Sequence, residues 1–161
     1  MSGPLTARDV FRDPRHFLAY GFGAGLAPKA PGTAGTLVAI PVYLLVHLGG
    51  IWFYLGFTVG AFLVGIVVCG YTARRMGIAD PSGVVWDEIV GYLISMAGAP
   101  LGLIWIIAGF VLFRILDILK PWPICVLDRR IKGGFGIMLD DVAAGLVVAI
   151  LLGLASHVLN M

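Results

Sequence analysis

Two pairs of adjacent carboxylates are the residues of this sequence whose types and spacing best suit chemistry. Asp87 and Glu88 occur in WDEIVGY, Asp140 and Asp141 occur in LDDVAAG, and each pair stands directly before an apolar run. We expect both pairs to open helices on one face of the protein, where their oxygens could bind a divalent cation such as Mg²⁺. The simpler alternative is that acidic residues are common in first turns, because the helix dipole favours anions there.

A stripe of ionisable residues occupies the end of another apolar segment. In FRILDILKPWPI, Arg114, Asp117 and Lys120 lie at positions i, i+3 and i+6, and so on one side of a helix. Ionisable residues within such a segment are costly and more often functional than not. An arginine and a lysine near clustered carboxylates could hold a phosphate against a metal. The structural alternative is that Arg114 and Lys120 extend toward water while Asp117 only pairs with Arg114.

A loop rich in glycine and proline, GFGAGLAPKAPGTAGTL at residues 21–37, precedes the first apolar segment. We expect Thr33 to be the N-cap of the following helix, with Thr36 in its first turn. Free N–H groups at such a helix start, beside Lys29, would form a seat for an anion such as phosphate. The alternative is a membrane-entry loop whose glycines only permit turns.

Apolar segments must position these side chains. At a rise of ~1.5 Å per residue, three of these segments are about as long as the ~30 Å hydrocarbon core of a membrane, and one is short. The segment at 88–97 is only about half that length, so it is open whether this segment spans the membrane or re-enters it. Strand-like alternation is absent and the mean hydropathy is +0.99. We predict an all-α, polytopic membrane bundle forming one domain over residues 1–161, with residues 1–20 as a cytoplasmic segment. The five segments are roughly 34–48, 51–73, 88–97, 101–119 and 142–158.

The charged residues indicate one polar face. If the N-terminus is cytoplasmic, all 11 basic and 9 acidic residues fall on the cytoplasmic side or at the inner ends of helices. Basic residues close to span ends mark that side. A net charge of +2, with no basic run interleaved with aromatic residues, argues against a nucleic-acid partner. We therefore place the chemistry at the cytoplasmic surface of a lipid bilayer.

Four stretches of the sequence resemble the phosphatidylglycerophosphatase A family. They are GFGAGLAPKAPGTAGTL, VVWDE, FRILDILKPWPI and GGFGIMLDDVAAG, and they follow one another between residues 21 and 145. The resemblance implies a Mg²⁺-dependent, multi-pass enzyme of the bacterial inner membrane with its active site on the cytoplasmic side. Such an enzyme removes the terminal phosphate of phosphatidylglycerophosphate and so makes phosphatidylglycerol for phospholipid biosynthesis.

The resemblance also implies roles for the residues in these stretches. Arg114 and Lys120 would hold the phosphate, and Asp117 would orient Arg114, join the metal shell or act as the catalytic base. The acidic pairs would bind one or two Mg²⁺ ions and take part in catalysis: Asp87, Glu88, Asp140 and Asp141. The loop before the first apolar helix would add substrate-binding donors: Lys29, Thr33 and Thr36.

Other mechanisms and functions stay open at this point. An attacking carboxylate would give an aspartyl-phosphate intermediate in place of direct attack by water. A small transporter or channel subunit for an anion or a divalent cation also uses intramembrane charges and broken helices, although the outer face here has no charged residue to receive an ion. A non-enzymatic lipid-binding scaffold would need neither acidic pair. The oligomeric state and the acyl-chain preference are open as well.

Overall fold

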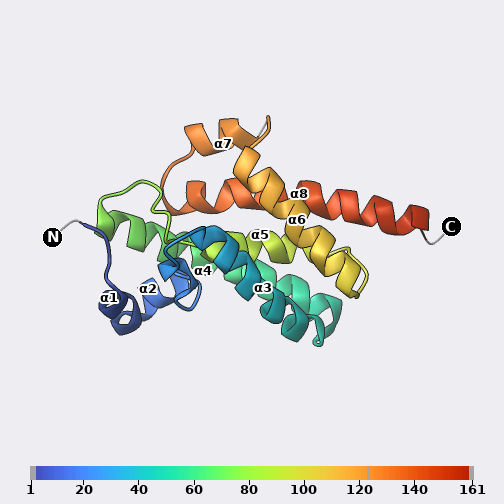
Figure 1. Cartoon of the computed structure of the whole chain (residues 1–161), viewed down its shortest axis with the longest axis horizontal. Helices are drawn as coiled ribbons and strands as arrows, with labels where there is room; N and C mark the ends of the chain where they lie inside the picture. Colours follow the sequence, from blue (N-terminus) through green and yellow to red (C-terminus); the bar gives the residue numbers. More distant parts are fainter. Residues whose placement is uncertain (1–2, 123, 160–161) are drawn as a thin grey trace.

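Figure 1 shows the computed structural model of the protein, which describes residues 3–122 and 124–159. Every regular element within these ranges is helical and none is a strand, so the predicted all-α class is confirmed for them. The elements are, in chain order, α1 (Ala7–Arg12), α2 (Pro14–Ala19), the 3₁₀ turn η1 (Ala24–Leu26), α3 (Pro31–His47), α4 (Gly50–Met76), α5 (Trp86–Met96), α6 (Leu103–Leu119), α7 (Ile124–Arg130) and α8 (Gly133–Leu159).

The number of membrane-crossing helices was overestimated from the sequence. All five apolar segments are helical, but among the described residues only α4 and α8, with 27 residues each, are long and apolar enough to cross a membrane. A helix needs about 20 apolar residues to span the hydrocarbon core. The segment predicted over 101–119 forms α6, which has only 17 residues and carries Arg114 and Asp117 in its second half. Two apolar helices therefore indicate membrane association, in place of five crossing or dipping segments.

The short helix α5 owes its apolar sequence to burial within the protein. It is surrounded by α3, α4, α6 and α8, and Figure 1 shows it in the middle of the molecule. Nine of its 11 residues are buried. The turn before it is fixed by two backbone hydrogen bonds, from Val84 to the carbonyl of Pro81 and from Val85 to the carbonyl of Ala19, each 2.9 Å long. The Asp-Pro-Ser-Gly stretch thus forms the turn that starts α5.

Two helices begin earlier than the sequence predicted. The first apolar helix, α3, starts at Pro31 with Ala30 as its N-cap, so the prediction of Thr33 as the cap is wrong. Proline is favoured at a first helical position because its φ is already helical and its missing N–H would have no partner there. The helix α8 starts at Gly133, and Asp140 and Asp141 therefore lie two turns inside it rather than at its start.

Close backbone contact joins α5 to α8. A Cβ atom on Gly145 would lie 2.5 Å from the carbonyl oxygen of Gly91, and one on Gly91 would lie 2.9 Å from that of Asp141. No side chain fits between the two backbones at either position, which is the use that small residues have at crossings of apolar helices. This crossing sets how close the first turn of α5 comes to Asp141.

The long helix α4 packs against both α5 and α8. The indole Nε1 of Trp86, the first residue of α5, donates a 2.9 Å hydrogen bond to the carbonyl of Ala61. At the other contact, a Cβ on Gly134 of α8 would lie 2.9 Å from the Cα of Gly70. Both the start of α5 and the start of α8 are therefore fixed against α4.

The helix α2 also packs on the end of α4. The Nδ1 atom of His16 lies 2.9 Å from the Oγ1 of Thr72, and the Arg15 guanidinium stacks 3.8 Å from the ring centre of Tyr71. Burial lowers the pKa of His16, so the neutral ring is favoured at this contact. The N-terminal segment is thereby ordered on the same end of the molecule as the charged residues.

Candidate active site

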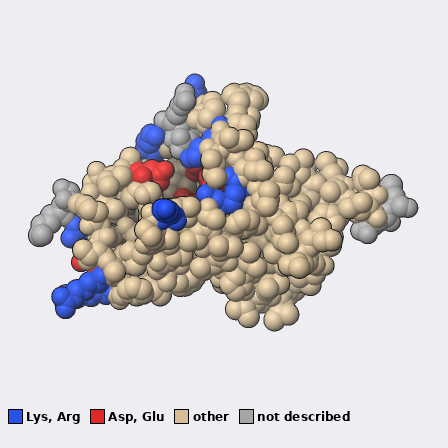
Figure 2. Space-filling view, viewed as in Figure 1, with Lys and Arg blue, Asp and Glu red and all other residues tan. Residues whose placement is uncertain are grey.

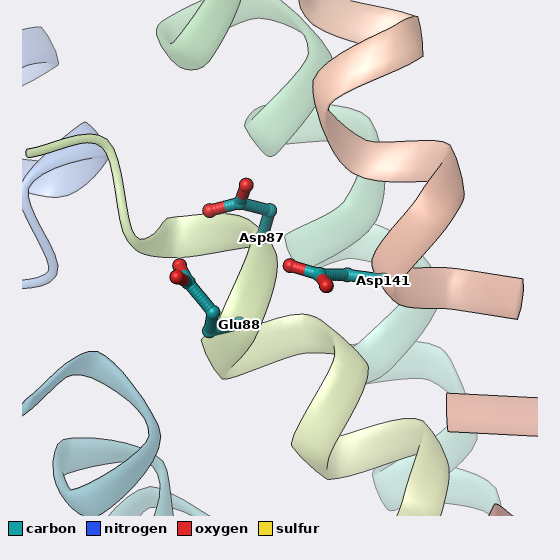
Figure 3. Close-up of side chains that lie close together, drawn as sticks. All are labelled: Asp87, Glu88 and Asp141. Atoms are coloured by element: carbon teal, nitrogen blue, oxygen red, sulfur yellow. The ribbon is translucent and has the colours of Figure 1, made fainter. Parts of the chain in front are cut away.

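Three of the four paired carboxylates come together in the structure. Asp87 and Glu88 lie in the first turn of α5, as the sequence predicted, and Asp141 extends toward them from α8 (Figure 3). One oxygen of each residue lies within 4.8 Å of the others, and no further residue belongs to this group among those the structure describes. We call Asp87, Glu88 and Asp141 the carboxylate triad.

Two of the three triad residues are buried, and each triad residue has an oxygen without a hydrogen-bond partner. Asp87 and Asp141 are only 8% and 3% exposed. The Oδ1 atoms of both aspartates and the Oε2 of Glu88 are buried without a hydrogen-bond partner. Burying a carboxylate in this way is costly, and like charges at this distance repel one another. An all-oxygen group with free lone pairs fits a hard divalent cation such as Mg²⁺, which would supply the missing charge.

Arg114 brings a positive charge to the edge of the triad. Its Nη1 lies 3.8 Å from the Oε1 of Glu88 and forms an ion pair with Asp117, one turn further along α6. Its Nε atom is buried without an acceptor. The pairing with Asp117 fits the predicted orienting role, and the free Nε–H leaves one donor that a bound anion could use.

The start of α3 abuts this arginine and Glu88. A Cβ on Gly32 would overlap the Oε1 of Glu88 and would lie 3.1 Å from both Nη atoms of Arg114. The N-cap residue, Ala30, offers no side-chain acceptor to the first-turn N–H groups, which also lack partners within the helix. Helix starts without a cap are favourable places for an anion, and the anion seat at this one stays a prediction.

Lys120 and Asp140 form a second contact beside the triad. Lys120 is the C-cap of α6, and its Nζ pairs with the Oδ2 of Asp140 on α8. Asp140 does not belong to the triad, although it is the neighbour of Asp141 in sequence. Successive residues on a helix point about 100° apart, so the two aspartates cannot both face α5.

The remaining predicted substrate-binding residues differ in their exposure. Thr33 lies in the first turn of α3 and is half-buried, while Thr36 is fully buried and donates its hydroxyl hydrogen bond to the carbonyl of Gly32 at 2.9 Å. Lys29 is exposed in the preceding loop. Figure 2 shows acidic and basic side chains around a hollow on this face, whereas the half nearer the C-terminus carries none on the same face.

Sequence reasoning missed the glycines that shape the site. Gly32 makes room for Glu88 and Arg114, and Gly91 and Gly145 let α5 and α8 meet. Gly32 could have been noticed in the Pro-Gly-Thr stretch that starts α3, because glycine is a poor helix former and its presence in a first turn indicates a close contact or a functional role. The other two lie in apolar runs with other glycines, where only the three-dimensional contact distinguishes them.

Comparisons with known proteins agree with the resemblance found in the sequence. The sequence profile of the phosphatidylglycerophosphatase A family matches residues 17–156. The chain is 45% identical over 147 residues to Phosphatidylglycerophosphatase A of Escherichia coli (strain K12), which covers 90% of this chain and 85% of that protein. It is 46% identical over 140 residues to Phosphatidylglycerophosphatase A of Haemophilus influenzae, with 86% of each chain covered.

A third relative has a different name. It comes from Bacteroides thetaiotaomicron, is provisionally named a phosphatidylinositol-3-phosphatase, and is 38% identical over 152 residues, with 87% of this chain and 92% of that protein covered. No solved structure gives a significant match. The family profile and the two relatives named first each extend over most of the chain, and the protein belongs to the phosphatidylglycerophosphatase A family.

Proposed function

We propose that the protein hydrolyses the terminal phosphomonoester of phosphatidylglycerophosphate, giving phosphatidylglycerol and inorganic phosphate, in bacterial phospholipid biosynthesis. Membership of the family supports this activity, because the relatives from E. coli and H. influenzae carry its name. The observation that carries the proposal is the carboxylate triad, whose unpartnered oxygens lie beside a guanidinium and an uncapped helix start. Those are the parts that hydrolysis of a phosphate ester needs.

We assign a Mg²⁺ site to the triad. Asp87, Glu88 and Asp141 would hold the ion through the oxygens that lack partners. When bound, Mg²⁺ neutralises phosphate charge and makes a bound water easier to deprotonate. The donor set supports Mg²⁺ over softer metals, since no sulfur or imidazole belongs to the group among the described residues.

The protein's own donors would hold the phosphate. Arg114 has an unpartnered Nε–H, and Gly32 in the first turn of α3 lies against Glu88 and Arg114, so the N–H groups of that turn could add further donors. In the reaction, a water oxygen forms a bond to phosphorus while the bond to the glycerol oxygen breaks, and the alcohol leaves with a proton. Donors fixed in advance around the phosphate oxygens stabilise the charge that spreads over them in the transition state.

The lipid part of the substrate would remain in the bilayer. The two long apolar helices, α4 and α8, support membrane association, and the charged side chains gather at one end of the molecule (Figure 2). Basic residues close to the ends of these helices, among them Arg74 and Arg75, favour the cytoplasmic side for that end. We therefore place the site at the cytoplasmic face of the inner membrane, where only the headgroup has to reach it.

Release of inorganic phosphate tests the proposal directly. Purified protein in detergent should release phosphate from phosphatidylglycerophosphate with Mg²⁺ and stop when EDTA is added. Asp141→Ala should lower the rate by about a hundredfold or more, because one ligand of the triad is lost. Asp9→Ala is the matched control, since it removes an exposed carboxylate from α1 and should retain activity.

Two results would contradict the proposal. Folded wild-type protein that releases no phosphate would exclude the activity and would direct attention to ion flux in liposomes. Release that persists in EDTA, or in Asp141→Ala, would exclude the assigned metal site.

The B. thetaiotaomicron relative favours one further substrate for the same assay. Phosphatidylinositol 3-phosphate also presents a phosphomonoester at the membrane surface. We expect faster release from phosphatidylglycerophosphate, because the two relatives named for that substrate are 45% and 46% identical to this chain, against 38% for the third. A faster rate with the inositol lipid would reassign the substrate and leave the site unchanged.

A further inference from the structure

We propose that Asp140 is a positioning residue that holds the Lys120 ammonium group at the phosphate, and that it does not bind the metal ion. The inference rests on the proposed function and deepens it, since it gives adjacent aspartates in one motif different tasks. It also replaces the expectation from sequence that all four paired carboxylates are metal ligands.

The orientation of α8 separates the two aspartates. Asp141 joins Asp87 and Glu88 within 4.8 Å, and Asp140 is not part of that group. Rotation of α8 to exchange the two side chains is blocked one turn further on, where Gly145 meets the backbone of Gly91. Because adjacent helical residues point about 100° apart, this contact fixes Asp141 toward α5 and Asp140 toward the end of α6.

The two aspartates also differ in their partners. Asp141 has a buried oxygen without any hydrogen-bond partner, which leaves that oxygen available as a metal ligand. Asp140 instead accepts from the Nζ of Lys120, so its charge is already balanced by a cation. A carboxylate that is engaged by an ammonium group is a poorer candidate for a metal ligand than one that is not.

The backbone of Lys120 is unusual in a way that supports the pair. Its φ is +41°, in the left-handed region that a side chain disfavours, and its N–H caps α6 by bonding to the carbonyl of Leu116 at 2.8 Å. Pro121 follows and prevents the helix from continuing. This turn ends α6 at the point where the lysine side chain reaches Asp140, and the ion pair offsets part of the cost of the strained backbone conformation.

A held lysine differs from a free one in what it can do for a phosphate. A lysine side chain has several rotatable bonds, and fixing it costs conformational entropy each time a ligand binds. The Asp140 side chain is 9% exposed and that of Lys120 is 27% exposed, so the pair is largely sheltered from solvent. Asp140 thus keeps the ammonium in place before the phosphate arrives.

Metal binding without substrate provides the first test. The probe is Mn²⁺, a divalent ion that also prefers oxygen ligands and is detectable by electron paramagnetic resonance, added to the purified full chain in detergent. Asp141→Asn should weaken Mn²⁺ binding by about tenfold or more. The double variant Lys120→Gln/Asp140→Asn keeps the net charge and should bind Mn²⁺ within about threefold of the wild type. That change is smaller than the roughly tenfold or greater loss of affinity expected when a metal ligand, or a residue that hydrogen-bonds to one, is removed. A loss in the double variant as large as that in Asp141→Asn would show that Asp140 is a ligand.

Kinetics provide the second test. Asp140→Asn and Lys120→Gln should each raise the KM for phosphatidylglycerophosphate about tenfold, the equivalent of one charge-assisted hydrogen bond, with little change in kcat. The double variant should be no worse than Lys120→Gln alone, because both changes remove the same interaction. Asp140→Glu, which keeps the charge, should recover part of the loss. Effects that multiply in the double variant would contradict a shared role.

The two tests also separate this inference from the proposed function. If the wild type releases no phosphate, the function is wrong, and Mn²⁺ binding still decides whether Asp140 is a ligand. If the wild type does not bind Mn²⁺, the metal site is wrong, and the KM values decide whether Asp140 acts through Lys120. Far-ultraviolet circular dichroism of each variant verifies that the helices remain, and Lys120→Gln tests the pair should Asp140→Asn fail to fold.

Discussion

Arg114 lies between Glu88 and Asp117 and still has a buried Nε–H that no protein acceptor satisfies. A guanidinium that served structure alone would be expected to use its donors, because an unpaired buried donor costs stability. The same reasoning applies to the three unpartnered oxygens of the triad a few ångströms away. These unpaired donors and acceptors support the proposal that a cation and an anionic phosphate bind side by side in this region.

Gly32 gives the sharpest test at the scale of single residues. In Gly32→Ala, the new methyl group would overlap the Oε1 of Glu88, so this flexible side chain must move. We expect phosphate release to fall by about tenfold or more, since misplacement of a group by about 1 Å can cost a hundredfold. The melting temperature should hardly change, because a side-chain end is displaced and the backbone is not.

The matched control for this variant lies on α4. Nothing is within 4 Å of a Cβ placed on Gly56, so Gly56→Ala should leave activity unchanged and should keep or slightly raise the melting temperature, because alanine is the better helix former. Full activity in Gly32→Ala would show that Glu88 and Arg114 can move without loss, and would remove the start of α3 from the site.

At the scale of elements, the crossing of α5 and α8 determines whether the triad exists. Gly145→Ala would place a methyl group 2.5 Å from a backbone carbonyl, which cannot yield as a side-chain end can. We expect a loss of about 1–3 kcal/mol in unfolding free energy, as for other overpacked cores, together with a loss of activity as Asp141 moves from Asp87. Chemical denaturation and phosphate release measure the two effects.

Gly153→Ala is the control on the same helix, since nothing lies within 4 Å of a Cβ there. It should be neutral or slightly stabilising, because alanine is the better helix former. Equal effects of Gly145→Ala and Gly153→Ala would mean that the crossing does not depend on the glycine.

The local parts of this arrangement could be predicted from the sequence, and the non-local parts could not. The start of α5 follows from turn residues before Trp86, and the end of α6 before Pro121 follows from the proline. The start of α8 at Gly133 was missed, because its first turns combine glycines with two aspartates and have no continuous apolar pattern. The different partners of Asp140 and Asp141 depend on how α8 is rotated against its neighbours, which hydropathy does not report.

At the scale of the whole molecule, the triad should reduce stability when no cation is bound. Three carboxylates held close together, two of them buried, repel one another when ionised, so Mg²⁺ should raise the melting temperature of the wild type and EDTA should lower it. In EDTA, Asp141→Asn should melt a few degrees higher than the wild type, as expected for removal of about 1 kcal/mol of repulsion. Scanning fluorimetry in detergent measures both shifts.

The control for this prediction is a variant that loses one carboxylate charge outside the triad. Asp9→Asn removes an exposed carboxylate and should keep the full response to Mg²⁺. If neither Mg²⁺ nor EDTA changes the melting temperature of the wild type, other groups of the protein already balance the charge of the triad carboxylates.

The burial of almost all of α5 has a consequence for protein engineering. This helix contributes the centre of the core, through residues such as Ile89 and Leu93, and it also carries Asp87 and Glu88 in its first turn. A repacking substitution that shifts α5 will therefore move the oxygens of Asp87 and Glu88 as well, and, if the proposed site is correct, stability and activity cannot be tuned separately there. Stabilising substitutions that spare activity should instead be sought on the outward faces of α4 and α8, where glycines such as Gly56 and Gly153 stand in open space.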